Sequence, residues 1–158
     1  MKKKVIFFTN TLWFFEKFKY ELIKDISKES NVICIYLRKG PAINIDKINE
    51  LVKFNNVQFK TLKEFTFAYL PKKLGSFLNS NRKNKRDIKI IIFTIGPIII
   101  SLLFPNYYKN KTVYVLEGLG RIFSSKKTIH LFLKKIVTQI YKYLFKKSQS
   151  VFVLNSHD

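Results

Sequence analysis

The stretch YVLEGLGRIFSS, residues 114–125, combines residue types that can bind and position a polar ligand. An apolar run ends in Glu117, and Gly118, Gly120 and Arg121 follow within four residues. A carboxylate accepts hydrogen bonds from hydroxyl groups, glycine lets the backbone approach a ligand, and arginine pairs with phosphates. The alternative explanation is a strand-end turn in which the glycines shape the backbone and the glutamate is only solvated.

The charge of the chain points to an anionic partner. Thirty Lys and Arg residues face ten Asp and Glu residues, which gives a formal net charge of +20, and Glu117 is the only acidic residue between Asp87 and Asp158. Nucleic acid, a phosphate-bearing substrate and an anionic membrane surface are the partners that such a balance favours. The alternative explanation is a general bias of the composition toward Lys, Ile, Asn and Phe, which would produce the positive charge without any anionic partner.

Apolar runs that alternate with helical patterns predict the fold class. Consecutive apolar residues typical of buried strands are expected at 3–9, 31–37, 56–60, 88–94, 111–117 and 149–155. Helices are expected between several of them, at residues 13–27, 46–54 and 128–147. This order predicts an α/β protein with a Rossmann-like open parallel sheet and helices on both faces.

Two of these helices show apolar residues at helical spacing, which predicts their buried faces. In the first helix the predicted stripe is Phe14, Phe18, Leu22 and Ile26. In the last helix it is Ile129, Phe132, Leu133, Ile136, Ile140 and Leu144, with lysines on the rest of the surface.

Residues 90–108 contain no charge and approach the length of a transmembrane helix. Gly96-Pro97 in the middle and Pro105 near the end favour a buried strand, a turn and a short buried helix instead, because proline breaks a helix interior. The basic N-terminus runs into charges and lacks a cleavage site, so a first strand fits it better than a signal peptide. With Cys34 as the single cysteine, the sequence predicts a cytoplasmic chain without internal disulfides.

Ligands of open α/β sheets bind at the carboxyl ends of the strands. Applied to this sequence, that rule predicts a site that includes Asn10, Gly96, Glu117, Gly118 and Gly120. The chain contains no P-loop, no dinucleotide-binding glycine motif, no nucleophile elbow and no metal-ligand spacing of Cys and His.

At these strand ends the sequence resembles a known family. The matching features are the first strand followed by Asn10, Trp13, Phe14 and Phe15; the run IIIFTIGP; Gly118, Leu119, Gly120 and Phe123; the long basic helix; and the final VFVLNSHD. In this order they resemble the N-terminal domain of a bacterial family 4 glycosyltransferase with the two-domain GT-B fold. Such enzymes build capsule, lipopolysaccharide O-antigen and other lipid-linked glycans.

The resemblance implies that residues 1–158 form the acceptor-side domain of a retaining glycosyltransferase. A nucleotide-sugar would be the donor, a lipid-linked glycan the acceptor, and no metal or other cofactor would be required. Glu117 would then contact a sugar hydroxyl, Asn10, Gly96, Gly118 and Gly120 would shape the floor of the site, and Arg121 would meet phosphate. The lysines predict a peripheral location on the anionic inner face of the cell membrane.

Two features depart from the family pattern. Many members carry a His-Arg pair in the first helix, whereas the matching positions here are Phe18 and Lys19. The sequence also ends at Asp158, before the donor-binding second domain of the family. We therefore expect a fragment, a truncated gene product or one subunit of a split enzyme, inactive alone unless a second chain supplies the donor domain.

The rival interpretation is a basic module that binds membranes or nucleic acid without catalysis. Most aromatic residues fall within the expected core strands and helices rather than on an exposed stacking platform, so we expect no nucleic-acid partner.

Overall fold

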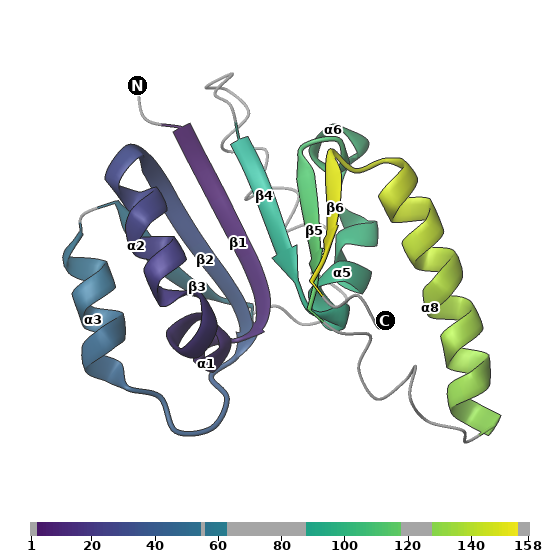
Figure 1. Ribbon diagram of the computed structural model, residues 1–158, viewed down its shortest axis with the longest axis horizontal. Helices are drawn as coiled ribbons and strands as arrows, with labels where there is room; N and C mark the ends of the chain where they lie inside the picture. Colours follow the sequence, from purple (N-terminus) through teal and green to yellow (C-terminus); the bar gives the residue numbers. More distant parts are fainter. Residues whose placement is uncertain (1–2, 55, 63–87, 118–127, 155–158) are drawn as a thin grey trace. The chain divides into compact units, whose positions relative to one another are not determined.

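The computed structural model describes residues 3–54, 56–62, 88–117 and 128–154 of the 158-residue chain (Figure 1). The chain divides into two compact units, residues 1–90 and residues 91–158, and each unit is described by itself.

The described strands form a six-stranded sheet. They are β1 (Lys3–Thr11), β2 (Ser30–Arg38), β3 (Val57–Thr61), β4 (Ile88–Phe93), β5 (Thr112–Leu116) and β6 (Ser150–Val153). Their order is β3-β2-β1-β4-β5-β6, and the pairs β1–β2, β2–β3 and β5–β6 are parallel. This is the strand order of a Rossmann-like open sheet, so the predicted α/β fold class is confirmed.

The core of the first unit contains strands that are buried on both faces. Five consecutive residues of β1, Val5–Thr9, are buried, and so are Val32–Ile35 of β2. Successive side chains of a strand point to opposite faces, so consecutive burial means that both faces are covered. The parallel register places Phe7 opposite Cys34, which is fully buried.

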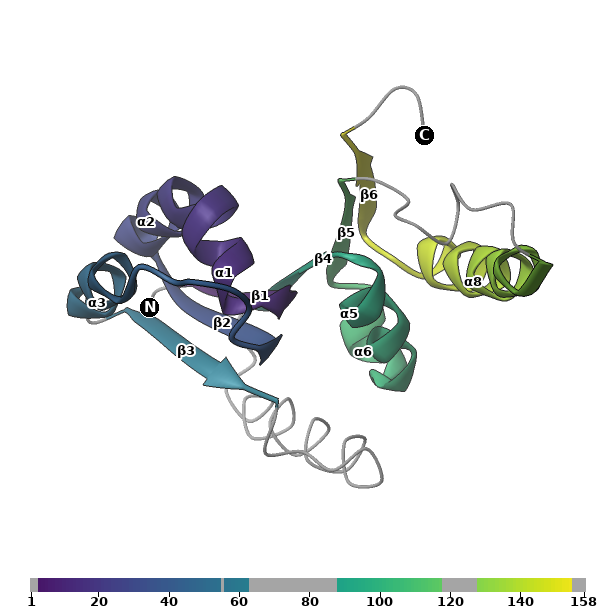
Figure 2. The same cartoon turned by 90° about the horizontal axis from the view of Figure 1, so that it is seen from below.

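Helices of the first unit pack on the strands that they connect. They are α1 (Leu12–Phe14), the π-helix η1 (Phe15–Lys19), α2 (Tyr20–Glu29) and α3 (Ile45–Lys53). Capping side chains fix two of their starts: Thr11 Oγ1 accepts from Phe14 N at 3.2 Å, and Asn44 Oδ1 accepts from Asp46 N at 3.0 Å. Both α2 and α3 lie on one side of β1, β2 and β3 (Figure 2).

The predicted buried stripe of the first helix is wrong. Phe18 and Leu22 are 58% and 42% exposed. The residues that are buried instead are Leu12, Phe15, Glu16, Ile23 and Ser27. The buried residues also lie at helical spacing, but on another side of the helix. That side includes a glutamate and a serine, so apolar periodicity selected the wrong side.

In the second unit, the uncharged stretch after β4 is broken into short elements. They are α5 (Ile95–Ile100), the 3₁₀-helix η4 (Ser101–Leu103) and α6 (Asn106–Lys109). Pro97 is accommodated in the first turn of α5, where the backbone N–H groups have no partner within the helix. Within the described ranges, no helix is long and apolar enough to cross a membrane.

The last helix, α8 (Thr128–Lys146), also buries a different face from the one predicted. Its buried residues are Val137, Tyr141 and Leu144, while Phe132, Leu133 and Ile136 of the predicted stripe are exposed. Only Leu144 of that stripe is fully buried, and the side chain of Ile129 lies outside the described part. The helix carries apolar residues on more than one side, so periodicity alone did not identify the packed face.

Candidate functional site at the carboxyl ends of the strands

Three of the six predicted site residues lie in the described part of the chain. Asn10 is a half-buried residue of β1 in the first unit. Gly96 is the second residue of α5, and Glu117 directly follows β5; both belong to the second unit. Gly118, Gly120 and Arg121 lie outside the described residues.

In the second unit, β4 and β5 are hydrogen-bonded neighbours and their arrows end at the same edge of the sheet (Figure 1). Thr94 follows β4 and Glu117 follows β5 at that edge. The hydrogen bond from Leu154 N to Leu116 O, at 2.9 Å, extends the pairing of β6 with β5 up to Glu117. Thr94 and Glu117 are therefore the first residues after two neighbouring strands, at the same edge of the sheet.

Thr94 is held in an unfavourable conformation. Its φ is 68° and its ψ is 152°, a region that is essentially restricted to glycine, and it is the only non-glycine residue with positive φ in the described part. Its hydroxyl oxygen is buried and has no hydrogen-bond partner among the described residues. Both features lower the stability of the fold. Strained residues and unsatisfied buried polar groups are concentrated at binding and catalytic sites.

A buried hydrogen bond joins the helical segment after β4 to β5 near this edge. Ser101 Oγ donates to Ile98 O at 2.6 Å and lies 2.8 Å from Tyr114 Oη, so the helical segment after β4 is tied to the middle of β5. Burial raises the pKa of Tyr114 to about 12, so its hydroxyl stays neutral and available for this bond. The rings of Tyr114 and Phe145, 5.5 Å apart, add a contact to α8.

The matching edge of the first unit contains a second strand-end arrangement. Thr9 is fully buried, and its Oγ1 makes no hydrogen bond within the described ranges. The loop after β2 packs on the start of α1: Lys39 O accepts from Trp13 N at 3.0 Å, and Gly40 has a φ of +95°. A Cβ on Gly40 would lie 2.9 Å from Trp13 Cβ, so this position requires glycine.

An aromatic cluster with one exposed ring, that of Phe18, follows β1 in the first unit. The ring of Phe18 lies 5.4 Å from that of Trp13 and 5.4 Å from that of Phe14, and Lys19 Nζ lies 5.5 Å from the Phe14 ring. Phe18 and Lys19 occupy the positions at which the resembled family often has His and Arg. Phe18, which the sequence predicted to be buried, is therefore an exposed apolar residue at the position of the family's histidine.

Glu16 is a buried carboxylate that the sequence reasoning missed. Its side chain is 0% exposed, and Oε1 lies 3.3 Å from Lys17 Nζ and 4.0 Å from Lys47 Nζ. Neither carboxylate oxygen has a hydrogen-bond partner among the described residues. Glu16 lies at helical spacing from the buried Ile23 and Ser27, at i+7 and i+11, but an apolar pattern does not select a glutamate.

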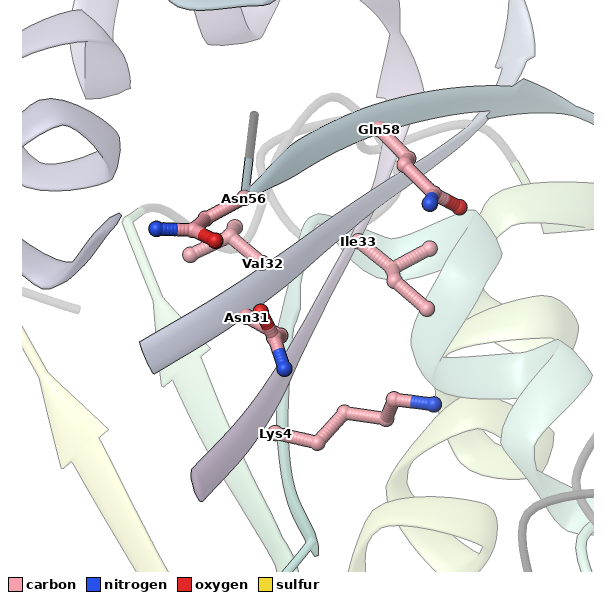
Figure 3. A pocket seen from close by; sticks show the side chains of 6 residues that line it. All are labelled: Lys4, Asn31, Val32, Ile33, Asn56 and Gln58. Carbon is pink, nitrogen blue, oxygen red and sulfur yellow. The ribbon is translucent and has the colours of Figure 1, made fainter. Parts of the chain in front are cut away.

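A separate polar pocket of about 220 Å³ lies at the opposite, amino ends of the strands in the first unit. Its lining residues are Lys4, Asn31, Val32, Ile33, Asn56 and Gln58 (Figure 3). The register pairs Lys4 with Asn31 and Ile33 with Gln58, so these four side chains share one face of the strands. Asn56 is used structurally, because its Nδ2 donates to Ser27 O at 3.4 Å and its O accepts from Val32 N at 2.7 Å.

The described residues contain no group of three or more His, Cys, Asp or Glu side chains that could hold a metal ion. No protein-family model matches the chain, and no curated protein matches its sequence. The candidate site therefore depends on the geometry at Thr94 and Glu117.

Proposed function

We propose that the chain is the acceptor-side domain of a retaining GT-B glycosyltransferase that extends a lipid-linked or polysaccharide glycan at a bacterial membrane. One observation carries the proposal. Thr94, which follows one strand, has a strained backbone and a buried hydroxyl without a partner among the described residues, and the carboxylate Glu117 follows the next strand of a Rossmann-like sheet. The sequence features that resemble family 4 glycosyltransferases include both strand ends.

In this proposal Glu117 accepts a hydrogen bond from a hydroxyl of the acceptor sugar. Thr94 and Gly96 shape the surface of the second unit beside it, with Gly118, Gly120 and Arg121 as further contacts. The donor would be a nucleotide-sugar whose phosphates are met by backbone N–H groups and basic side chains. A second domain, in the same or a partner chain, would hold that donor.

The lysine-rich composition supports a peripheral location on the inner face of the membrane, where anionic headgroups attract basic side chains. The acceptor would then be presented at the same surface. This location is proposed from charge, and salt screens an attraction of that kind.

The direct test is binding of acceptor and donor analogues to the purified chain, measured by calorimetry and by NMR. A lipid-diphosphate-linked glycan analogue should bind, and Glu117→Gln should weaken it about tenfold to a hundredfold, as expected for losing a hydrogen bond to a charged group. Glu29→Gln, which changes an exposed carboxylate at the end of α2, is the matched control. Absence of acceptor binding, or equal binding by Glu117→Gln, would contradict the proposal.

A second measurement tests turnover after fusion of the chain to a donor-binding domain. Glu117→Gln should then lower the transfer rate and leave the melting temperature unchanged. If melting temperature and transfer rate fall together, Glu117 is a structural residue and the site assignment is wrong.

A further inference from the structure

The helix α8 carries two apolar stripes, one packed and one exposed. The inner stripe packs within the second unit and consists of Val137, Tyr141 and Leu144, all buried. The outer stripe consists of Phe132, Ile136 and Tyr143, which are 65%, 41% and 44% exposed.

Helical geometry places the outer stripe on one side of α8. Its members are spaced at i, i+4 and i+11, which falls along one side of a helix with 3.6 residues per turn. A surface helix normally presents polar residues outside its packed face. An apolar stripe in that place is the pattern of a surface that contacts something else.

Basic side chains surround the outer stripe. Lys135, Lys142 and Lys146 are exposed along its flank, and the sequence of α8 contains no acidic residue. Beside Tyr143, Lys147 Nζ donates to the Tyr143 hydroxyl at 3.1 Å and lies 4.6 Å from the centroid of the same ring. Lys109 Nζ lies 5.2 Å from that centroid.

We propose that the outer stripe of α8 inserts into the headgroup region of an anionic bilayer. Phe132 and Ile136 would reach the acyl boundary, Tyr143 would lie at headgroup level, and the flanking lysines would contact the anionic headgroups. Apolar residues beside a lysine-rich face define an interfacial helix. A protein interface fits less well because the core of such interfaces is depleted in lysine.

Nucleic acid fits less well too, since its phosphates would meet the lysines but offer the aliphatic Ile136 little to contact. The inference rests on the peripheral membrane location proposed above and deepens it by naming the helix and the side chains. It adds a specific consequence. Headgroup attraction is screened by salt, whereas burial of apolar side chains is not, so part of the binding should survive high salt.

Liposome sedimentation of the full chain at low and high salt tests this inference, with vesicles of phosphatidylglycerol and phosphatidylcholine. The wild type should bind anionic vesicles at low salt and keep a measurable fraction bound at high salt. The variant Phe132→Ser, Ile136→Ser should bind about tenfold more weakly at low salt and not at all at high salt. The matched control changes two exposed apolar residues of α3, Ile45→Ser and Val52→Ser, and should bind as the wild type does.

The outcomes separate the two proposals. If no variant binds anionic vesicles, the membrane location itself is wrong. If the wild type binds, but the α8 variant and the α3 control bind equally well, the location stands and insertion of α8 is refuted. If the wild type instead self-associates and the α8 variant does not, the outer stripe is an interface between copies of the chain.

Fluorescence gives a second readout that does not depend on affinity. Trp13 is the single tryptophan, so Phe132→Trp in a Trp13→Phe background places the only indole on the outer stripe. Anionic vesicles should shift its emission to the blue, and lipids brominated on the acyl chain should quench it. Ile45→Trp in the same background is the control and should show neither effect. Emission from position 132 that vesicles leave unchanged would overturn the proposal.

Discussion

Replacing Thr94 tests whether its backbone stores strain. The residue has a φ of 68° and a ψ of 152°, which costs about 1–3 kcal/mol for a residue other than glycine. Thr94→Gly removes this cost and loses about 0.5–1 kcal/mol through the greater freedom of glycine in the unfolded chain. Thr94→Ala keeps a Cβ at the same φ and therefore keeps the strain.

Both substitutions delete the buried hydroxyl, so the difference between them isolates the backbone term. We expect Thr94→Gly to be more stable than Thr94→Ala by about 1 kcal/mol, which corresponds to roughly 2–4 °C in melting temperature for a chain of this size. Thr94→Ser, which keeps the hydroxyl and the strain, is the control and should melt near the wild type.

The assay is thermal unfolding followed by circular dichroism, with chemical denaturation as a second measure of the free energy. Equal stability of the glycine and alanine variants, or a less stable glycine variant, would refute the strain at Thr94. If glycine stabilises the chain but abolishes acceptor binding, the strain is part of the binding site.

Three further predictions concern the packing. Gly40→Ala should destabilise the chain by about 1 kcal/mol or more because of its φ of +95° and the 2.9 Å contact with Trp13; melting of this variant, with Lys39→Ala as the neutral control, checks it. Since burial raises the pKa of Tyr114 from 10.0 to about 12, its stabilising effect is complete below pH 10 and is lost as the pH rises toward 12. Between pH 10 and pH 12 the free energy of unfolding should therefore fall less for Tyr114→Phe than for the wild type, by up to about 3 kcal/mol. Equal pH dependence of the two proteins would argue against burial of Tyr114. Burial also raises the pKa of the Cys34 thiol, so a maleimide should label it only at the rate of unfolding, and rapid labelling of the native chain would contradict the fold.

The strands were predictable because their signal is local. The consecutive apolar residues at Val5–Phe8 and Val32–Ile35 can be buried together only in strands that are covered on both faces, and the structure buries them all. The strands β4 and β5 each end one residue before the predicted end, so Thr94 and Glu117 directly follow their strands.

The packed faces of the helices were less predictable. In the first helix, the buried Glu16 lies on the stripe of Ile23 and Ser27, and no rule of apolar periodicity selects a glutamate. In α8 two apolar stripes compete, and only contacts with distant residues such as Tyr114 decide which one is packed. The strain at Thr94 was equally hidden, because it depends on how the chain leaves β4 rather than on residue type.

The π-helix η1 determines which single-residue deletions in this helical segment the fold can tolerate. The backbone hydrogen bonds of a π-helix run over five residues, whereas those of an α-helix run over four. The wide turn therefore holds one residue more than a continuous helix needs. Deletion of Lys17 should convert η1 into ordinary helix and leave Ile23 in place. Deletion of Lys24, in α2, would rotate every later residue of the helix by about 100° and move Ser27 away from the core.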